Sequence, residues 1–349
     1  MSIFNSYWRK LLLVWLVIAS FALPVPYLSQ QPGPTFNTLG KLGKSDFIEI
    51  RNAETFPTSG ELDMTTVREI GGAQQTITLG EAIFGWIHPH YTVLPRRANY
   101  PDDVTAEQSR TQSTRAFASS QELALGAVLR LLGIPFTESI YVVDTIADRP
   151  AADFLKPNDR IYSVNGLAVF TVEKTIAAVR ETNPGDIVTL TVGRDGKTFD
   201  IEIPTVPAPD SAKAGSIGAF LTSEIESEIK AEFADQRVGG PSAGLVFAIA
   251  IYDKLTPGQL TGDAHIAVTG TISTTGEVGA IGGIRQKMIG ARASGATYFL
   301  LPIDNCDEAI KRIPKGLTAI PVGTLAEAVA VLERLKSDPS GSLPSCSAG

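Results

Sequence analysis

The feature that most constrains this chain is a run of small residues that leads directly into an apolar segment. Residues 239–244 read Gly-Gly-Pro-Ser-Ala-Gly, and residues 245–252 read Leu-Val-Phe-Ala-Ile-Ala-Ile-Tyr. The apolar run is typical of a buried helix, so Ser242 is predicted to lie at or near a helix N-terminus. Amides at that position lack partners within the helix, and the helix dipole favours negative charge there. A serine hydroxyl so placed is a candidate nucleophile, and the neighbouring amides are candidates for stabilising an oxyanion.

The base for such a serine is predicted to be a lysine and not a histidine. The chain has three histidines, which are His88, His90 and His265. The first two flank a proline in an apparent loop, and no acidic neighbour is in place to orient them. Residues 284–294 have a helical pattern that contains Lys287 among apolar and small residues and ends at Gly295. Burial in such surroundings lowers the pKa of a lysine from ~10.4 toward the ~7–8 that a general base requires.

Three ordered motifs resemble the proteolytic domain of the Lon proteases. They are Gly-Pro-Ser-Ala-Gly at 240–244, Thr-Gly at 269–270 and Gly-Gly-Ile-Arg-Gln-Lys at 282–287. The resemblance implies a catalytic Ser-Lys dyad of Ser242 and Lys287, with Thr269 beside it. The expected supporting residues around the serine are Gly240, Pro241 and Ala243. Alone, the serine is a plain helix cap and the lysine a surface residue, but the ordered combination favours the dyad.

Two positions depart from the Lon pattern, and one large motif is missing. Gly239 stands where the family often has an acidic residue, and Thr271 stands where it often has glutamate. No Walker-type Gly-x-x-x-x-Gly-Lys-Ser/Thr occurs in the 349 residues. We therefore expect an ATP-independent activity that needs no nucleotide, no cofactor and no metal.

A rival Ser-x-x-Lys motif lies at residues 227–230, which read Ser-Glu-Ile-Lys. That tetrapeptide also marks penicillin-binding enzymes, but the companion Ser-Asp-Asn and Lys-Thr-Gly motifs are missing. The charged neighbours of Ser227 and Lys230 favour a solvated segment. Acidic composition excludes another class of partner, because a net charge of −7 offers no basic surface to neutralise the phosphates of a nucleic acid.

The N-terminus carries a candidate membrane segment. Residues 1–10 end in Arg9-Lys10, and residues 11–28 contain no charge. A helix of that length at ~1.5 Å per residue just spans a hydrocarbon core of ~30 Å. The positive residues predict a cytoplasmic N-terminus, a single-pass anchor in the cell membrane and a body on the extracytoplasmic side. The alternative is a signal peptide that is cleaved near residues 20–22.

Residues 134–205 resemble a PDZ domain. They contain Leu-Lys-Pro-Asn-Asp-Arg-Ile at 155–161 and Val-Asn-Gly at 164–166, followed by a helical pattern at 172–181 and two alternating strand patterns. Asn158 replaces the usual glycine and is a residue that tolerates positive φ. The resemblance implies binding of extended peptides by strand addition. The alternative is a small β domain that only packs against the catalytic unit.

The order of segments predicts an insertion. Residues 206–213 have the composition of a linker, residues 214–336 hold the Lon-like region, and residues 337–349 form a loose tail. Only about 30 residues lie between the linker and Ser242, too few for several strands of ~5–6 residues with turns. Residues 35–133 are therefore expected to belong partly to the protease domain, with the strands of 45–72 packed against 214–336. The PDZ domain is then inserted.

The two cysteines leave two alternatives open. Cys306 and Cys346 do not form a metal pattern. In an exported chain they either form a bridge across about 40 residues or remain two free thiols.

The predicted fold class is α/β (α+β): a Lon-like proteolytic domain, a PDZ-like β domain and an N-terminal transmembrane helix. The whole arrangement resembles the bacterial membrane-anchored PDZ–Lon serine proteases of the YlbL type. It implies an ATP-independent serine endopeptidase that hydrolyses extracytoplasmic proteins or peptides. The alternative is a membrane-tethered PDZ scaffold whose Lon-like domain is inactive or only self-cleaving.

Overall fold

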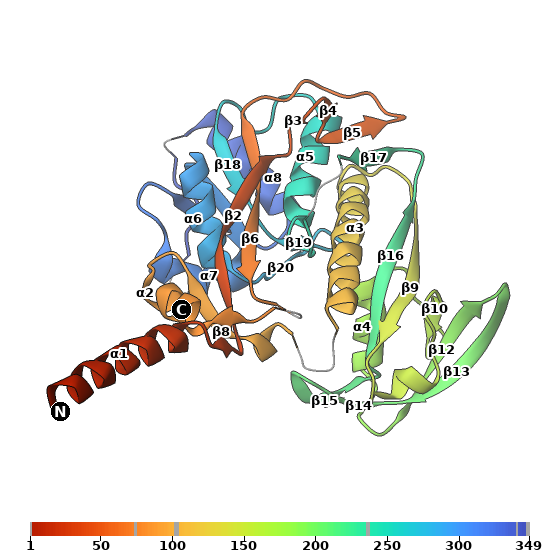
Figure 1. The fold of residues 1–349 in the computed structure, drawn as a ribbon. Coiled ribbons are helices and arrows are strands. Elements are labelled where there is room, and N and C mark those ends of the chain that lie inside the picture. The colour runs from red at the N-terminus through yellow and green to blue at the C-terminus, as the bar shows by residue number, and fades with distance from the viewer. Residues whose placement is uncertain (1, 73–74, 101–104, 235–237, 340, 347–349) are drawn as a thin grey trace.

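The computed structural model describes residues 2–72, 75–100, 105–234, 238–339 and 341–346. These residues form two large β-sheets with helices around them, and helix α3 (Ala106–Leu131) lies between the two sheets (Figure 1). The larger unit has helices on both faces of a mixed sheet, whereas the smaller unit is mainly β. The class is therefore mixed α and β, as the sequence predicted.

The main sheet is built from strands that lie far apart in the sequence. Its six strands are β2 (Tyr27–Asn37), β6 (Glu61–Ile70), β8 (Thr92–Pro95), β18 (His265–Val268), β21 (Tyr298–Pro302) and β22 (Thr318–Val322). They lie in the order β22-β21-β18-β6-β2-β8. The first four of that order run parallel, and β2 is antiparallel to both of its neighbours. Half of the sheet thus comes from the first hundred residues.

Helices cover both faces of the main sheet. Helices α5 (Gly244–Leu255) and α8 (Leu325–Ser337) pack in one hydrophobic core with Val268. Helix α6 (Ile284–Ser294) packs in another core with Ala267. Neighbouring strand residues enter different cores because successive side chains of a strand point to opposite faces of the sheet.

Residues 45–72 pack against residues 214–336, as predicted. Strand β5 (Ile48–Arg51) pairs antiparallel with β17 (Lys230–Phe233). Strand β6 pairs with β18 from Glu61 opposite His265 to Met64 opposite Val268. The chain therefore leaves the main sheet after β8, builds the smaller unit and then returns.

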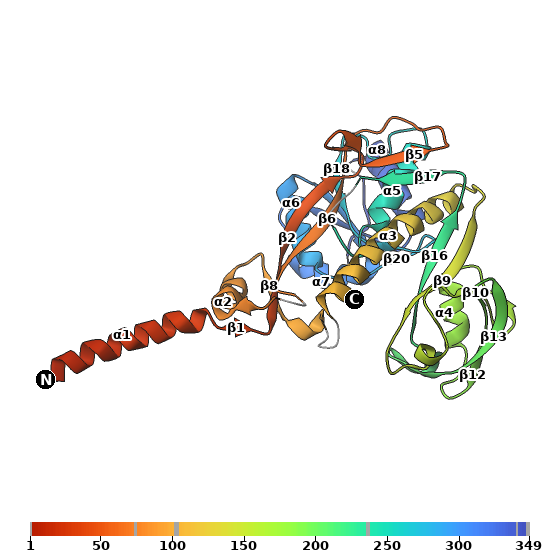
Figure 2. The same ribbon diagram turned by 45° about the vertical axis from the view of Figure 1, so that its right-hand side comes forward.

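The smaller unit has its own sheet and its own core. Its strands are β9 (Thr137–Thr145), β10 (Arg160–Val164), β11 (Leu167–Ala168), β12 (Ile187–Arg194), β13 (Lys197–Pro204) and β16 (Ala219–Glu226). They follow the order β13-β12-β10-β9-β16, with β11 paired to β10, and helix α4 (Val172–Arg180) accompanies them. Figure 2 shows this unit set apart from the main sheet. The predicted helix and hairpin of this region are present.

The predicted linker at residues 206–213 is wrong. Strands β14 (Val206–Ala208) and β15 (Ser211–Ser216) form a hairpin there. Prolines suggested a linker, but an isolated two-stranded hairpin accommodates them because its outer edges need no ladder hydrogen bonds. Strand β16 then joins the smaller sheet, so the protease unit does not begin at residue 214.

The predicted helix over residues 11–28 is also wrong in its bounds. Helix α1 spans Ser2–Phe21, and Leu28 is a fully buried residue of β2. Pro24 and Pro26 follow the helix and prevent its continuation. Within the described part of the chain, no helix is both long and apolar enough to cross a membrane. Figure 2 shows α1 projecting from the body.

The remaining elements are short. The strands are β1 (Pro24–Val25), which pairs with β7 (Ile77–Thr78), β3 (Lys41–Leu42), which pairs with β4 (Ser45–Asp46), and β19 (Thr271–Ile272), which pairs with β20 (Val278–Gly279). The helices are α2 (Leu79–Ile87), α7 (Cys306–Ala309), and the 3₁₀ turns η1 (Arg96–Ala98), η2 (Pro150–Asp153), η3 (Ile303–Asn305) and η4 (Ile310–Arg312).

The tail is not entirely loose. Ser337 still belongs to α8, and a disulfide joins Cys346 to Cys306, 40 positions earlier. The structure therefore has the bridge and not the two free thiols. Residues 340 and 347–349 of the predicted tail lie outside the described residues.

Candidate active site

Ser242 lies in the loop that leads into α5. Helix α5 begins at Gly244, two residues after the serine, so the predicted position near a helix N-terminus is confirmed. Gly240 has a φ of 89°, a conformation that strains any residue other than glycine. A Cβ on Gly244 would approach within 3.0 Å of the backbone nitrogen of Ile272. The small residues of the motif therefore let the loop turn sharply and pack against β19.

Thr269 and Gly270 fix the backbone of Ser242. The carbonyl oxygen of Ser242 accepts a hydrogen bond from the Gly270 amide at 3.0 Å and another from the Thr269 hydroxyl at 3.2 Å. The Leu245 amide in turn donates to the Gly270 carbonyl at 3.1 Å. The segment after β18 thus holds the serine loop and the start of α5 in one register.

Lys287 reaches Ser242 from α6, which packs on the face of the main sheet opposite to α5. It lies one turn into α6, and only 3% of the residue is exposed. Its Nζ is 2.5 Å from the Ser242 Oγ and 2.9 Å from the Thr269 Oγ1. The three residues singled out in the sequence therefore meet at one point, although they come from separate elements.

The hydrogen-bond directions at this point depend on the charge of the lysine. The Thr269 hydroxyl uses its own proton toward the Ser242 carbonyl, so its oxygen accepts from the Lys287 amine. A charged ammonium has three donors and no acceptor, and it donates to the serine as well. A neutral amine keeps a lone pair, and Thr269 already takes one of its N–H groups. That lone pair is left to accept the serine proton.

Burial favours the neutral amine. It lowers the pKa of Lys287 from its ordinary value to about 7, because the ammonium loses its hydration and gains no carboxylate in exchange. The resulting pKa lies in the range in which a general base works at neutral pH.

The pair opens into a cleft of about 840 Å³. Its walls come from β2, β6, α3, the serine loop and the segment before α6, and the predicted supporting residues Gly240, Pro241 and Ala243 are among them. Phe36, Met64 and Phe117 give the cleft an apolar side. The sequence did not point to Ser113 and Phe117, which reach the cleft from α3.

One edge of β6 faces this cleft. Strand β18 pairs with β6 only as far as Met64, and the next five residues, 65–69, all line the cleft. Alternate side chains of a strand point to opposite faces, so five consecutive lining residues indicate that the backbone edge itself faces the cleft. In the described part of the chain, no strand pairs with that edge beyond Met64.

The amides around Ser242 are not all engaged. The Gly240 amide donates to the Ser113 carbonyl, and the Gly244 amide donates to the Pro241 carbonyl. Within the described residues, the amides of Ser242 and Ala243 have no such acceptor. These two amides flank the Ser242 side chain and are available to a ligand.

The histidines and the rival serine lie elsewhere. His88 stacks at 4.0 Å on Tyr91, with His90 beside it, and His265 is bonded at 2.9 Å to Asp63. Ser227 accepts from the Ile229 amide at 3.1 Å, and Lys230 is exposed on β17. No histidine contact to Ser242 and no Ser227–Lys230 contact occur in the described residues.

Comparisons with known proteins match two segments of the chain. A model of the Lon protease C-terminal proteolytic domain matches residues 234–334, and a PDZ domain model matches residues 116–205. The chain contains a Lon-type proteolytic domain and a PDZ domain.

Several curated Lon proteases share this region. Lon protease 1 of Sorangium cellulosum is 40% identical over 101 residues, which cover 28% of this chain and 12% of that protein. The Lon protease of Fusobacterium nucleatum is 48% identical over 66 residues, which cover 19% of this chain and 8% of that protein. The Lon protease of Campylobacter concisus is 32% identical over 125 residues, which cover 36% of this chain and 15% of that protein. The chain therefore spans a small part of the length of these relatives.

Several solved structures are similar to a part of the chain. The PDZ domain of an SdrC-like protein from Listeria monocytogenes is 25% identical and covers 24% of this chain and 85% of that one, with a TM-score of 0.22. A solution structure of a protein from Geobacillus thermodenitrificans is 32% identical. The match covers 24% of this chain and 94% of that one, with a TM-score of 0.21.

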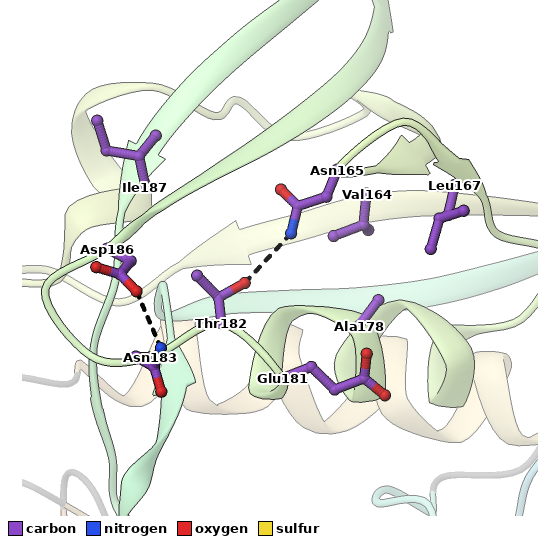
Figure 3. A pocket seen from close by; sticks show the side chains of 9 residues that line it. All are labelled: Val164, Asn165, Leu167, Ala178, Glu181, Thr182, Asn183, Asp186 and Ile187. Atoms are coloured by element: carbon purple, nitrogen blue, oxygen red, sulfur yellow. Dashed lines mark hydrogen bonds between the residues drawn. The ribbon is translucent and has the colours of Figure 1, made fainter.

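Besides the cleft at Ser242, the structure has a pocket of about 380 Å³ in the PDZ domain, which Figure 3 shows. It lies between α4, the turn after β10 and the start of β12, and Leu167 and Ile187 are exposed at its rim. Asn165 donates to Thr182 at 3.3 Å across it. The pocket is remote from the Ser242 loop.

Where β6 pairs with β18, the described residues include one group of three side chains with a donor set suited to a cation. Glu61, Asp63 and His265 place their donor atoms within 4.8 Å of one another. The cluster lies at the start of β18, at the end of that strand opposite to Thr269. The Asp63–His265 hydrogen bond ties β6 to β18, and the Ser242–Lys287 pair does not touch it.

The lowered pKa predicts how Lys287 affects stability. Between pH 7 and about 10.4, the unfolded chain binds a proton at this lysine that the folded chain does not, so the free energy of unfolding rises with pH in that interval. Lys287→Met lacks this contribution. The free energy of unfolding of the unaltered chain minus that of the variant should rise by up to about 1.4 kcal/mol per pH unit. Urea unfolding at pH 7, 8.5 and 10 measures it, and a constant difference would contradict the assignment.

Proposed function

We propose that this chain is a serine endopeptidase in which Ser242 is the nucleophile and Lys287 is the general base. The observation that carries the proposal is the 2.5 Å contact between a buried lysine amine and a serine hydroxyl at the floor of an open cleft. The buried amine has a pKa of about 7, so a substantial fraction is neutral at neutral pH. Only a neutral amine accepts the serine proton.

The chemistry follows from these contacts. The neutral Lys287 amine takes the Ser242 proton while Oγ forms a bond to the scissile carbonyl carbon, and the carbonyl oxygen becomes an oxyanion. The ammonium then returns that proton to the leaving nitrogen as the C–N bond breaks, which leaves an ester on Ser242. Water repeats the sequence: the amine takes its proton, the hydroxide oxygen adds to the ester, and the serine leaves with the proton.

Thr269 acts as a positioning residue in this scheme. Its oxygen accepts an N–H of the Lys287 amine at 2.9 Å, and its proton is directed to the Ser242 carbonyl at 3.2 Å. The amine lone pair is therefore directed at the serine. The available amides of Ser242 and Ala243 are placed to donate to the oxyanion, and Gly240 and Pro241 shape the loop that presents them.

The substrate is proposed to be a peptide or protein segment in extended form. The free edge of β6 at residues 65–69 offers backbone donors and acceptors along the cleft. A strand added there passes beside Ser242 and places side chains against Phe36, Met64 and Phe117.

We further propose that hydrolysis by this chain is independent of ATP and of any nucleotide, cofactor or metal. The sequence carries no Walker-type motif, and the scheme above draws on a serine, a lysine and backbone amides. The PDZ domain is proposed to bind peptides. Its edge strand β16 pairs with β9 on one side, and α4 lies near it, an arrangement suited to strand addition.

The working location is proposed to be the extracytoplasmic side of the cell membrane. The Cys306–Cys346 bridge supports an oxidising compartment, since disulfides rarely persist in the cytosol. The apolar side chains from Leu11 to Ile18 of α1 are all at least half exposed, so α1 is the proposed attachment to the membrane. A phosphatase fused after residue 349 and active only when exported should therefore show activity in the membrane fraction. Activity of a cytoplasm-restricted reporter at the same position would refute this location.

Substitutions should separate the dyad from its rival. Ser242→Ala and Lys287→Arg should each lower the turnover of unfolded casein by roughly 10⁴-fold or more, since arginine stays protonated and accepts no proton. Ser242→Ala should fold, because Ser242 does not cap α5, whose N-cap is Ala243 and has no side-chain cap. Lys287→Arg buries a permanent charge, so its turnover is compared only where circular dichroism shows the variant folded. Lys230→Ala is the matched control and should retain full turnover. A folded and active Lys287→Arg protein would overturn the mechanism.

The pH profile should report the lysine. Because the pKa of Lys287 is lowered to about 7, the fraction of neutral amine rises through neutral pH. Casein turnover should therefore increase with pH between 6 and 8 and level off above, in a range where the protein remains folded by circular dichroism. Turnover that falls over this interval is incompatible with a neutral lysine base.

A further inference from the structure

Asn305 holds the backbone of Ile281 by two hydrogen bonds. Its Oδ1 accepts from the Ile281 amide at 2.9 Å, and its Nδ2 donates to the Ile281 carbonyl at 2.9 Å. Asn305 is buried at the end of η3, with 6% of the residue exposed. A single side-chain amide thus satisfies both polar groups of one residue, as a neighbouring strand would.

The clamped segment leads directly to the lysine. Ile281 and its two neighbours, 280 and 282, all line the cleft. Gly283 follows with a φ of 70°, and its carbonyl accepts from the Lys287 amide at 3.1 Å. The Asn305 clamp therefore lies just before the first turn of α6, and the position of that turn determines where the Lys287 side chain begins.

A covalent bond holds the residue after the clamp. Cys306 begins α7 and is bonded to Cys346 of the tail. Cys346 and Ile281 pack against the same hydrophobic core, which also contains Ile284 and Met288 of α6. The disulfide thus holds the tail at the hydrophobic core on which both the Asn305 clamp and α6 pack.

We propose that Asn305 is a positioning residue for Lys287 and for the 280–282 wall of the cleft, and that the Cys306–Cys346 bridge holds Asn305 in place. The inference rests on the proposed function. Without the clamp, the two backbone groups of Ile281 turn to water, and water enters beside the start of α6. The amine then loses both its exact position relative to Ser242 and part of its desolvation.

The first test compares Asn305→Ala with the unaltered full chain on fluorescent casein. The value of kcat should fall about 10- to 100-fold, as expected for a small displacement of a reacting group, with a smaller change in KM. The midpoint of the pH–kcat profile should move to higher pH, because water around the amine raises the pKa of Lys287 toward its ordinary value. Asp307→Asn, an exposed change beside the bridge, is the matched control and should leave both quantities unchanged.

Asn305→Asp keeps the test available if the alanine variant does not fold. It preserves the side-chain volume and the acceptor for the Ile281 amide but removes the donor to the Ile281 carbonyl. It should shift the pH midpoint in the same direction. Loss of thermal stability with an unchanged midpoint in a folded variant would show a merely structural role and overturn the proposal.

The bridge is tested with dithiothreitol. The dithiol gives two electrons and two protons to the disulfide, which yields two thiols in the protein and a cyclic disulfide in the reagent. The unaltered chain should then lose several-fold in kcat, with its midpoint moved upward. A protein with both Cys306→Ser and Cys346→Ser should have the kcat of the reduced chain, and dithiothreitol should not change that kcat. Dithiothreitol should also leave the kcat of Asn305→Ala unchanged, because the clamp is already absent in that variant. Full activity after verified reduction would overturn the role of the bridge.

Amide hydrogen exchange separates this inference from the proposed function. If Ser242→Ala still digests casein, the proposed function fails, whereas the clamp is judged by the Ile281 amide alone. That amide should exchange faster in Asn305→Ala, and faster in the reduced chain, than in the unaltered protein. Unchanged protection at Ile281 in the variant would overturn the clamp whatever the activity.

Discussion

The removal of one lysine amine from water is the constraint on which the rest of this structure depends. A buried ammonium without a carboxylate is costly, so the site is stable only because the amine is able to become neutral and because two hydroxyls satisfy it. The contacts of Lys287 to Ser242 and Thr269 provide those hydroxyls. The same burial that costs stability lowers the pKa of Lys287, the proposed base, to about 7. Stability and reactivity are thus opposed at this one atom.

The depth of that amine depends on how closely α6 approaches the sheet. A Cβ on Gly290 of α6 would lie 3.2 Å from the Gly33 carbonyl of β2, and a Cβ on Gly33 would overlap the Thr66 hydroxyl of β6. Glycine at both positions lets helix and strand meet backbone to backbone. Gly283, at the start of α6, likewise leaves room for Val67. The strands that receive the helix come from the first seventy residues. Lys287, the proposed base, is therefore placed by a segment that precedes the PDZ domain.

Local patterns predicted that Ser242 and Lys287 lie together, because the position of each depends on features that are readable in short stretches of the sequence. The glycines, the apolar run after Ser242 and the helical pattern around Lys287 each describe their own surroundings. The membership of β16 in the smaller sheet was not predictable in this way, since it depends on pairing with β9 some eighty residues earlier. The contribution of α3 to the cleft was missed for the same reason. The N-terminal helix was misplaced because an uncharged run has no signal for where helix becomes strand, apart from its prolines.

Gly239 shows how such a distant contact explains a local departure. The Lon resemblance leads one to expect an acidic residue there, but a Cβ at this position would collide with the Ser113 hydroxyl of α3. The same turn of α3 accepts the Gly240 amide through the Ser113 carbonyl. Farther along α3, Arg130 contacts Glu138 of β9 and the Thr274 carbonyl of the loop after β19. One rigid helix therefore touches both the serine loop and the PDZ sheet. A displacement of α3 against the sheet has to be accommodated at Gly239 and Gly240, beside the proposed nucleophile Ser242.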